Sequence, residues 1–153
     1  MNTRNFTELK HFQSLSDAWW DEKGPFQLLH EITPQRVTFI KEKVGIHFHL
    51  PRNSLQPFQG LRVLDVGCGG GILCEPLARL GAEVIGIDPV RENIIQAQAH
   101  AEVMRLSITY LPCALEELPK DLPLFDVILA SEIIEHVENP DIFLKSASPK
   151  PSK

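Results

Sequence analysis

Hydrophobic and polar positions follow two different periods along this chain, and the change comes near residue 60. Before that point, apolar residues recur at helical spacing over residues 6–20 and 34–45, which predicts two N-terminal helices. Thr33 and Pro34 are suited to be the N-cap and the first residue of the second helix. The segment 47–60 contains proline, asparagine and glycine at short intervals, so it is expected to be a linker.

Beyond the linker, short apolar segments alternate with longer amphipathic ones. This alternation predicts an α/β fold with a parallel sheet and helices on both faces, and a ligand at the carboxyl ends of the strands. Asp88 is placed to cap the longest of these helices. The expected strands are residues 62–66, 83–87, 107–111 and 125–130, and the expected helices are residues 72–80, 89–104 and a short one at 115–118.

A glycine-dense turn after the first of these strands is the most informative segment. Glycines let a ligand approach the backbone, and the amides at the start of the next helix point toward it. An acid at the end of the second strand can accept hydrogen bonds from two ribose hydroxyls. The sequence therefore predicts a nucleoside-binding half-fold. Its residues are Asp65, Gly67, Gly69, Gly70 and Gly71, with Asp88 at the end of the second strand.

The spacing of these glycines distinguishes between two kinds of nucleoside. A dinucleotide-binding turn of the form G-x-G-x-x-G needs its third glycine at position 72, which is Ile72 here. The observed order D-x-G-x-G-G-G resembles motif I of the class I S-adenosylmethionine methyltransferases. That cofactor has no pyrophosphate, and Asp65 would suit its ammonium group. Binding of NAD by an oxidoreductase is the rival reading, and Ile72 counts against it.

Bulk composition restricts the class of protein further. A chain of 153 residues is expected to be one domain. Its net charge of −5 argues against nucleic acid as a partner. Three cysteines without zinc-ligand spacing indicate reduced thiols in an intracellular protein, and Cys68 fits as a small residue better than as a nucleophile. The N-terminus has neither a transit-peptide nor a secretory pattern, so organelle targeting would need a segment absent here.

Several segments together resemble one family within this superfamily, the ubiquinone-biosynthesis O-methyltransferases, and look closer to its mitochondrial members than to its bacterial ones. The resemblance covers about residues 14–145. Asp-Ala-Trp-Trp at the N-terminal end and Glu-Ile-Ile-Glu-His near the C-terminal end are its most specific parts. The matching segments are residues 17–24, 29–30, 33–36, 64–73, 86–90 and 130–137.

The resemblance implies a Rossmann-like class I methyltransferase fold that binds S-adenosylmethionine. It also implies methylation of catechol-type hydroxyls on polyprenylated precursors of ubiquinone, together with other ubiquinone-biosynthesis proteins. The expected location is the matrix side of the mitochondrial inner membrane, bound peripherally, or the cytoplasm of a bacterium. The implied cofactor-binding residues are Arg36, Asp65, Gly67, Gly69, Asp88 and Ser131.

Two of the residues near the expected cofactor have other roles open to them. Arg36 is implied to lie near the carboxylate end of the cofactor, but a solvated charge on a helix is the alternative. Leu115 and Glu116 are implied to line the adenine side, and Glu116 could equally cap a helix or face solvent.

Glu132, Glu135 and His136 have the spacing that places three side chains on one face of a helix. Two carboxylates and an imidazole could hold Mg²⁺. A free phenol has a pKa of about 10, and a bound metal ion would lower the pKa of the substrate hydroxyl and orient its oxygen. His136 could instead be a catalytic general base. In the alternative without metal, the glutamates favour the start of a helix while His136 packs or caps.

Trp19 and Trp20 form an unusual aromatic pair. On an amphipathic helix such a pair could cover the site or touch the membrane surface where a prenylated substrate resides. A helix that simply packs on the sheet is an equally good explanation.

Three regions are expected: a helical cap with its linker over residues 1–60, a partial cofactor-binding domain over residues 61–145, and a disordered tail over residues 146–153. The family continues through further strands that this sequence lacks, which would expose an apolar strand edge. A hypothesis follows that the chain binds cofactor while its catalysis is weak or absent. A non-catalytic partner in the biosynthetic complex is the rival function.

Overall fold

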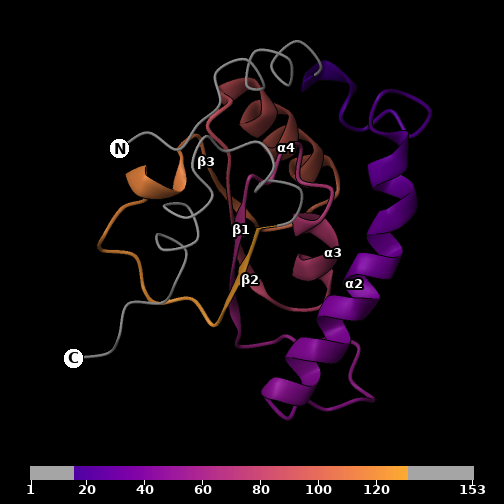
Figure 1. The fold of residues 1–153 in the computed structure, drawn as a ribbon, viewed down its shortest axis with the longest axis vertical. Coiled ribbons are helices and arrows are strands. Elements are labelled where there is room, and N and C mark those ends of the chain that lie inside the picture. The colour runs from indigo at the N-terminus through magenta and orange to yellow at the C-terminus, as the bar shows by residue number, and fades with distance from the viewer. Residues whose placement is uncertain (1–15, 131–153) are drawn as a thin grey trace.

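A parallel four-stranded sheet forms the centre of the computed structural model, which describes residues 16–130 (Figure 1). The strands lie in the order β3-β2-β1-β4. In chain order they are β1 (Arg62–Val66), β2 (Glu83–Ile87), β3 (Thr109–Leu111) and β4 (Val127–Leu129). The helices are η1 (Ser16–Ala18), α2 (Gln27–His47), α3 (Cys74–Arg79), α4 (Arg91–Val103) and η2 (Leu115–Glu117).

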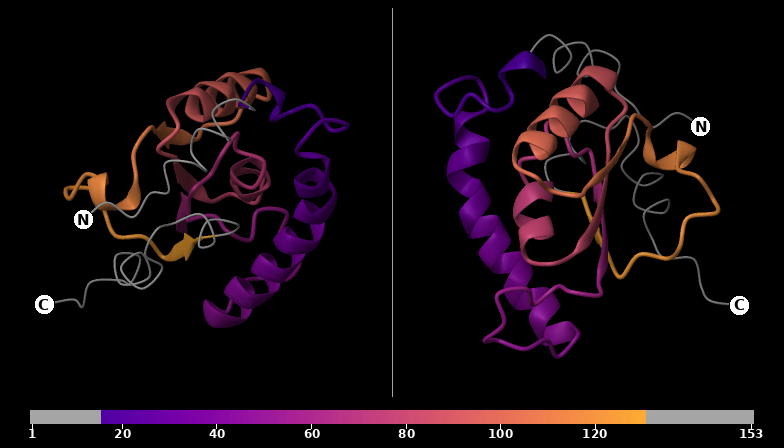
Figure 2. Two further views of the ribbon diagram at one scale, coloured as in Figure 1. Left: turned by 45° about the horizontal axis from the view of Figure 1, so that its top comes forward. Right: turned by 180° about the vertical axis from the view of Figure 1, so that it is seen from behind.

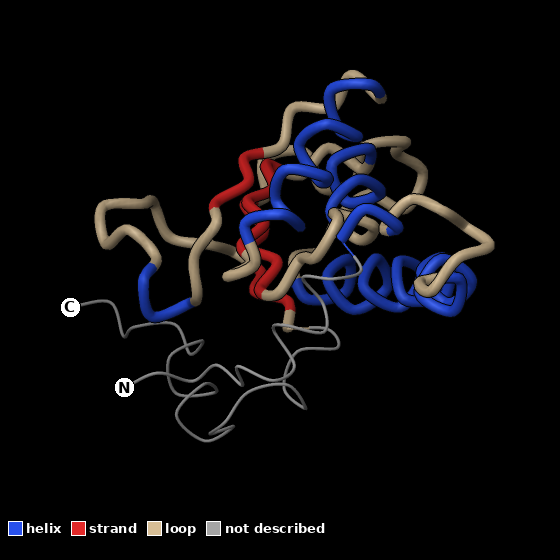
Figure 3. The backbone as a smooth tube through the Cα atoms, turned by 90° about the horizontal axis from the view of Figure 1, so that it is seen from above, coloured by secondary structure: helices blue, strands red, loops and turns tan. Residues whose placement is uncertain are grey.

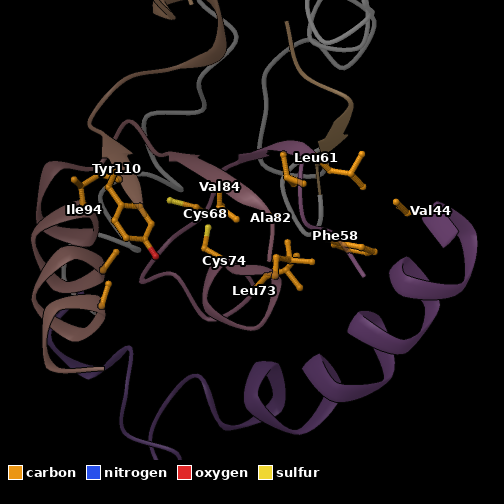
Figure 4. Close-up of a cluster of buried hydrophobic side chains, with 14 residues drawn as sticks. Val44, Phe58, Leu61, Cys68, Leu73, Cys74, Ala82, Val84, Ile94 and Tyr110 are labelled. Carbon is orange, nitrogen blue, oxygen red and sulfur yellow. The ribbon is translucent and has the colours of Figure 1, made fainter. Parts of the chain in front are cut away.

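The three α-helices of the described residues cover one face of the sheet, and η2 with its flanking loops lies on the other (Figures 2 and 3). Alternate residues of each strand face the two layers, because successive side chains of a strand point to opposite faces. The helical face buries Val63 and Val84 against α3 and α4, together with Tyr110 (Figure 4). The opposite face buries Leu64 and Ile85. Both faces therefore exclude water, as a parallel sheet requires.

The register of the sheet places the ends of β1 and β2 side by side. Asp65 is opposite Gly86, and Val66 is opposite Ile87. Both strands run in the same direction, so the turn after Val66 and the residue after Ile87 emerge at the same edge. This edge is where the sequence predicts the ligand.

The β-strands confirm the sequence-based expectations closely in the middle of the sheet and less closely at its edges. The observed bounds of β1 and β2 are the expected ones, whereas β3 and β4 are shorter by two and three residues. In the sheet of the described residues, β4 pairs only with β1. The residue before it, Asp126, accepts a hydrogen bond from the Arg62 amide through its side chain, at 2.8 Å.

The expected start of the second helix was wrong. Thr33 and Pro34 were predicted to open it, but α2 begins at Gln27 and contains Pro34 in its interior. A proline there has no amide to donate to the carbonyl one turn before it, so α2 continues with one helical hydrogen bond fewer. Two hydroxyls near the proline bond to other carbonyls of the helix. The Thr33 hydroxyl donates to the carbonyl of Leu29 at 2.6 Å, and the Thr38 hydroxyl donates to the carbonyl of Pro34 at 3.0 Å. Contacts of the first turn of α2 with the segment before it allow the helix to begin earlier than Thr33 and Pro34 predict.

No helix within residues 16–130 has the length and apolar character needed to cross a membrane.

Other predicted helix ends also differ. The helix expected over residues 72–80 is α3, which spans only Cys74–Arg79. A helix is predicted over residues 6–20, but residues 16–20 form the short 3₁₀ helix η1 followed by a turn that carries Trp19 and Trp20. Residues 6–15 lie outside the described residues. Residue 89 was expected to begin α4, which instead begins at Arg91. Asp88 does not cap it directly, because its carboxylate accepts from the Val90 amide at 2.9 Å, one residue before the helix.

Candidate cofactor site

The glycine turn between β1 and α3 is fixed to the end of β2. The amides of Gly67 and Cys68 both donate to the carbonyl of Ile87, at 2.8 and 2.9 Å. Gly67 has a φ of 73° and Gly69 has a φ of 55°, in the left-handed region where a side chain is costly. The sequence therefore needs glycine at both positions for the backbone to fold back onto β2.

Asp88 follows β2 directly, and its carboxylate is held against this turn. One oxygen, Oδ2, accepts from the Gly69 amide at 3.0 Å; the other, Oδ1, accepts from the Val90 amide at 2.9 Å and from Asn93 Nδ2 at 3.4 Å. Burial raises the pKa of the Asp88 carboxyl to about 6, although the two amide donors act in the opposite direction. A carboxylate has about four acceptor positions, so one remains for a further donor.

Asp65 lies in β1, and the partner that it has in the structure was not predicted from the sequence. Its side chain accepts a hydrogen bond from the Cys74 thiol at 3.2 Å, and the residue is 2% exposed. Burial raises the pKa of the Asp65 carboxyl to about 7, and the negative charge of Asp88 adds to this rise. The predicted contact of Asp65 with the cofactor ammonium stays a prediction.

The glycines at the end of the turn leave space for protein side chains. The sequence suggested a different reason for them, the close approach of a ligand. A Cβ atom on Gly69 or Gly70 would overlap the indole of Trp19, and one on Gly71 would overlap the hydroxyl of Tyr110. Access for a ligand is therefore not what demands glycine at these three positions. The Trp19 ring already lies against the backbone there.

Residues 16–26 form a segment that we call the aromatic strap, which carries Trp19, Trp20 and Phe26 across the glycine turn. The Trp19 and Phe26 rings stack with their centroids 3.7 Å apart, and both residues pack against Ile72 at the end of the turn. The Trp20 indole donates to the carbonyl of Gly70 at 2.9 Å. Both indoles therefore lie against the glycine turn, and the roles considered for the pair toward a ligand or a membrane stay predictions.

The other predicted residues divide into those the structure describes and those it does not. Arg36 lies in α2 and is partly buried. Leu115, in η2, packs on the sheet face formed by Leu64 and Ile87. Their contacts with a cofactor remain predictions. Outside the described residues lie Ser131, Glu132, Glu135 and His136.

Cysteine and metal chemistry were also predicted from the sequence. All three cysteines are free thiols. Burial raises the pKa of the Cys68 thiol to about 11, which disfavours the nucleophilic thiolate and agrees with a packing role. Among residues 16–130, no three His, Cys, Asp or Glu side chains are grouped so that they could hold a metal ion. The predicted magnesium ligands are not among these residues.

Comparison with known proteins places this site in a family. A family model described as a methyltransferase domain matches residues 64–148, which include the glycine turn and Asp88. The chain belongs to this family of methyltransferase domains. The rival oxidoreductase reading therefore loses its support.

Relatives with curated names agree with the narrower resemblance. The ubiquinone biosynthesis O-methyltransferase of Bartonella tribocorum is 42% identical over 93% of this chain, and that of Brucella ovis is 44% identical over 95% of it. The resemblance to the ubiquinone-biosynthesis enzymes is thereby confirmed. The chain spans 58% and 59% of the lengths of these two relatives.

Solved structures confirm the predicted fold class. The magnesium protoporphyrin IX methyltransferase of Synechocystis PCC 6803, solved with bound S-adenosylmethionine, is 27% identical over 67% of this chain and 45% of its own, with a TM-score of 0.53. The plantazolicin methyltransferase BpumL covers 95% of this chain and 56% of its own at a TM-score of 0.62. At 20% identity it shows the shared fold alone.

Sequence reasoning missed Asn93 as a member of the site. Asn93 is 2% exposed and lies between Asp88 and the Trp19 indole. Its position three residues into α4 gives no signal of this role. A polar residue on the buried face of an amphipathic helix was the available hint, because such a side chain requires a partner.

Proposed function

We propose that this chain binds S-adenosylmethionine at the glycine turn and is the cofactor-binding part of an O-methyltransferase of ubiquinone biosynthesis. The observation that carries the proposal is the hydrogen bond between the Gly69 amide and Asp88 Oδ2, at 3.0 Å. It joins the glycine turn to the acid at the carboxyl ends of β1 and β2, where α/β folds bind nucleosides. The curated names of the relatives supply the narrower reaction class.

The residues of the site fit the nucleoside part of this cofactor. The remaining acceptor position of the Asp88 carboxylate can take a ribose hydroxyl, provided that the carboxylate is ionised. The cofactor would supply the activated methyl group, while the chain binds and orients it. The acceptor class proposed is a polyprenylated catechol-type phenol, by analogy with the named relatives and the sequence resemblance.

Calorimetric titration of the 153-residue chain with S-adenosylhomocysteine tests the proposal. Saturable binding is expected, and Asp88→Asn should weaken it at least about tenfold, since a charged hydrogen bond contributes about 1.5–3 kcal/mol. Binding by the unaltered chain should also weaken as the pH falls through about 6, where Asp88 becomes protonated. A folded chain that binds NADH but not S-adenosylhomocysteine would refute the proposal.

Turnover with a catechol acceptor separates an active enzyme from a non-catalytic partner. Measured under saturating S-adenosylmethionine, methylation at rates typical of the family would contradict the hypothesis of weakened catalysis. Cofactor binding without methylation would favour the partner role.

The remaining parts of the proposal rest on the sequence resemblance. They are Mg²⁺ held by Glu132, Glu135 and His136, peripheral binding to the matrix side of the mitochondrial inner membrane, and association with other ubiquinone-biosynthesis proteins. Two carboxylates are suitable ligands for a hard cation, which supports the metal. We expect methylation to depend on Mg²⁺. We expect this dependence to disappear in the double variant that carries Glu132→Gln and Glu135→Gln.

A further inference from the structure

The aromatic strap is buried against the glycine turn through an apolar contact and a polar one. Trp19 is 6% exposed and Phe26 is 5% exposed, so their stacked rings are withdrawn from water together with Ile72. An indole also carries an N–H group that needs an acceptor once it is buried. The position of that acceptor connects the strap to Asp88.

Trp19 and Asp88 are linked through the amide of Asn93. The Trp19 indole Nε1 donates to Asn93 Oδ1 at 2.7 Å, and Asn93 Nδ2 donates to Asp88 Oδ1 at 3.4 Å. An indole N–H can only donate, so it requires the oxygen of the Asn93 amide to face it. The NH₂ group of Asn93 must then face Asp88. The strap thus decides which end of the amide points toward the carboxylate.

Trp20 anchors the same strap on the other side of the turn. Its indole donates to the Gly70 carbonyl, and its ring stacks on His100 with centroids 3.5 Å apart and planes within 3°. His100 in turn lies 2.6 Å from the buried Glu75, measured from Nδ1 to Oε2. Two consecutive indoles therefore attach the strap both to the glycine turn and to α4. Such a double attachment fixes the turn more strongly than packing alone would.

We propose that Trp19 and Asn93 are positioning residues for the cofactor: Trp19 orients the Asn93 amide, which holds the Asp88 carboxylate in place for the ribose. This inference rests on the proposed function, because it concerns how the same site binds S-adenosylmethionine. The strap is then a built part of the cofactor site, although it precedes the methyltransferase domain in the sequence. Its residues act on the cofactor through Asp88 and the glycine turn.

Two substitutions separate positioning from simple packing. Trp19→Phe keeps an aromatic ring over the glycines but removes the N–H donor. Asn93→Asp keeps an acceptor for the Trp19 indole and nearly the same volume, but it places a second carboxylate beside Asp88. Gln98→Glu is the matched control, because it adds the same charge on the exposed face of α4.

The measurement is the affinity of the 153-residue chain and its variants for S-adenosylhomocysteine by calorimetry as a function of pH, after thermal unfolding has shown each to be folded. Trp19→Phe is expected to weaken binding about tenfold at pH 7.5. Asn93→Asp should move the pH midpoint of binding upward by about one unit, because a neighbouring carboxylate opposes ionisation of Asp88. Gln98→Glu should leave affinity within about twofold, since exposed charges are screened.

The outcomes separate this inference from the proposed function. An unaltered chain that binds no S-adenosylhomocysteine overturns both. A second outcome is that the unaltered chain binds S-adenosylhomocysteine and that folded Trp19→Phe and Asn93→Asp bind it with the same affinity and the same pH midpoint. This result overturns the positioning role and leaves the proposed function standing. If Trp19→Phe does not fold, the pH midpoint of Asn93→Asp decides alone.

Discussion

Replacing Glu75 with glutamine tests how far a single buried carboxylate stabilises the region behind the glycine turn. The Glu75 side chain is 1% exposed. Its Oε2 lies 2.6 Å from His100 Nδ1, and its Oε1 accepts from Arg79 Nη2 at 3.2 Å. Glutamine preserves the size of the side chain but removes its charge and one of its two acceptors. The substitution therefore weakens both contacts without opening a cavity.

The expected loss in the free energy of unfolding follows from these two contacts. A hydrogen bond to a charged group contributes about 1.5–3 kcal/mol, which applies to the short contact with His100. Arg79 is 46% exposed, so its pair with Glu75 contributes less than about 1 kcal/mol after screening. We expect a total loss of about 1.5–4 kcal/mol. In a chain of this size that corresponds to a decrease in Tm of roughly 3–16 °C.

Urea unfolding at 25 °C, followed by circular dichroism, measures this loss. Glu83→Gln is the matched control, because Glu83 also pairs with an arginine, Arg62, at 3.3 Å, but its side chain is 66% exposed. The control should lose less than about 1 kcal/mol. Equal losses in the two variants would show that burial does not set the strength of the Glu75 contacts, and the reasoning would be wrong.

Two further substitutions test the glycine turn and the acid beneath it. Gly70→Ala should destabilise the chain by about 1–3 kcal/mol because the added Cβ overlaps the Trp19 indole, and the loss should nearly vanish in a Trp19→Ala background. A double-mutant cycle by urea unfolding checks this, and an equal loss in both backgrounds contradicts it. Asp65→Asn should stabilise the chain more at a pH of about 8 than at about 4.5. The folded-state pKa of Asp65, about 7, exceeds its ordinary 3.8, so ionisation costs stability as the pH rises between them, while asparagine still accepts from Cys74. Urea unfolding at both pH values measures the difference, and a gain independent of pH would refute the cause assigned here.

The elements whose signals are local could be predicted from the amino-acid order alone. The strands β1 and β2 are short apolar segments bounded by polar residues and glycines, and they appear at the expected positions. Gly67 and Gly69 marked the turn, and Asp88 marked the end of the next strand. The parallel arrangement then followed from the alternation of strands and helices, because right-handed crossovers bring successive strand ends to the same edge. The glycine turn also carried the resemblance to the class I methyltransferases, whereas the segments 17–20 and 132–136 carried the most specific part of the narrower resemblance.

Which groups meet at that edge depends on long-range packing and could not be predicted from the sequence. Residues far apart in the sequence are brought together there, and no local period records their contacts: the Trp19 indole lies on Gly69 and Gly70, and Asn93 links that indole to Asp88. The contacts of Trp19 also explain why α2 begins earlier than the sequence predicts. Phe26 packs under Trp19, so the helix begins at Gln27 despite Pro34 in its interior. At the start of α2, burial of the stacked rings outweighed the local signal, because the free energy of withdrawing aromatic rings from water exceeds a helix-end preference.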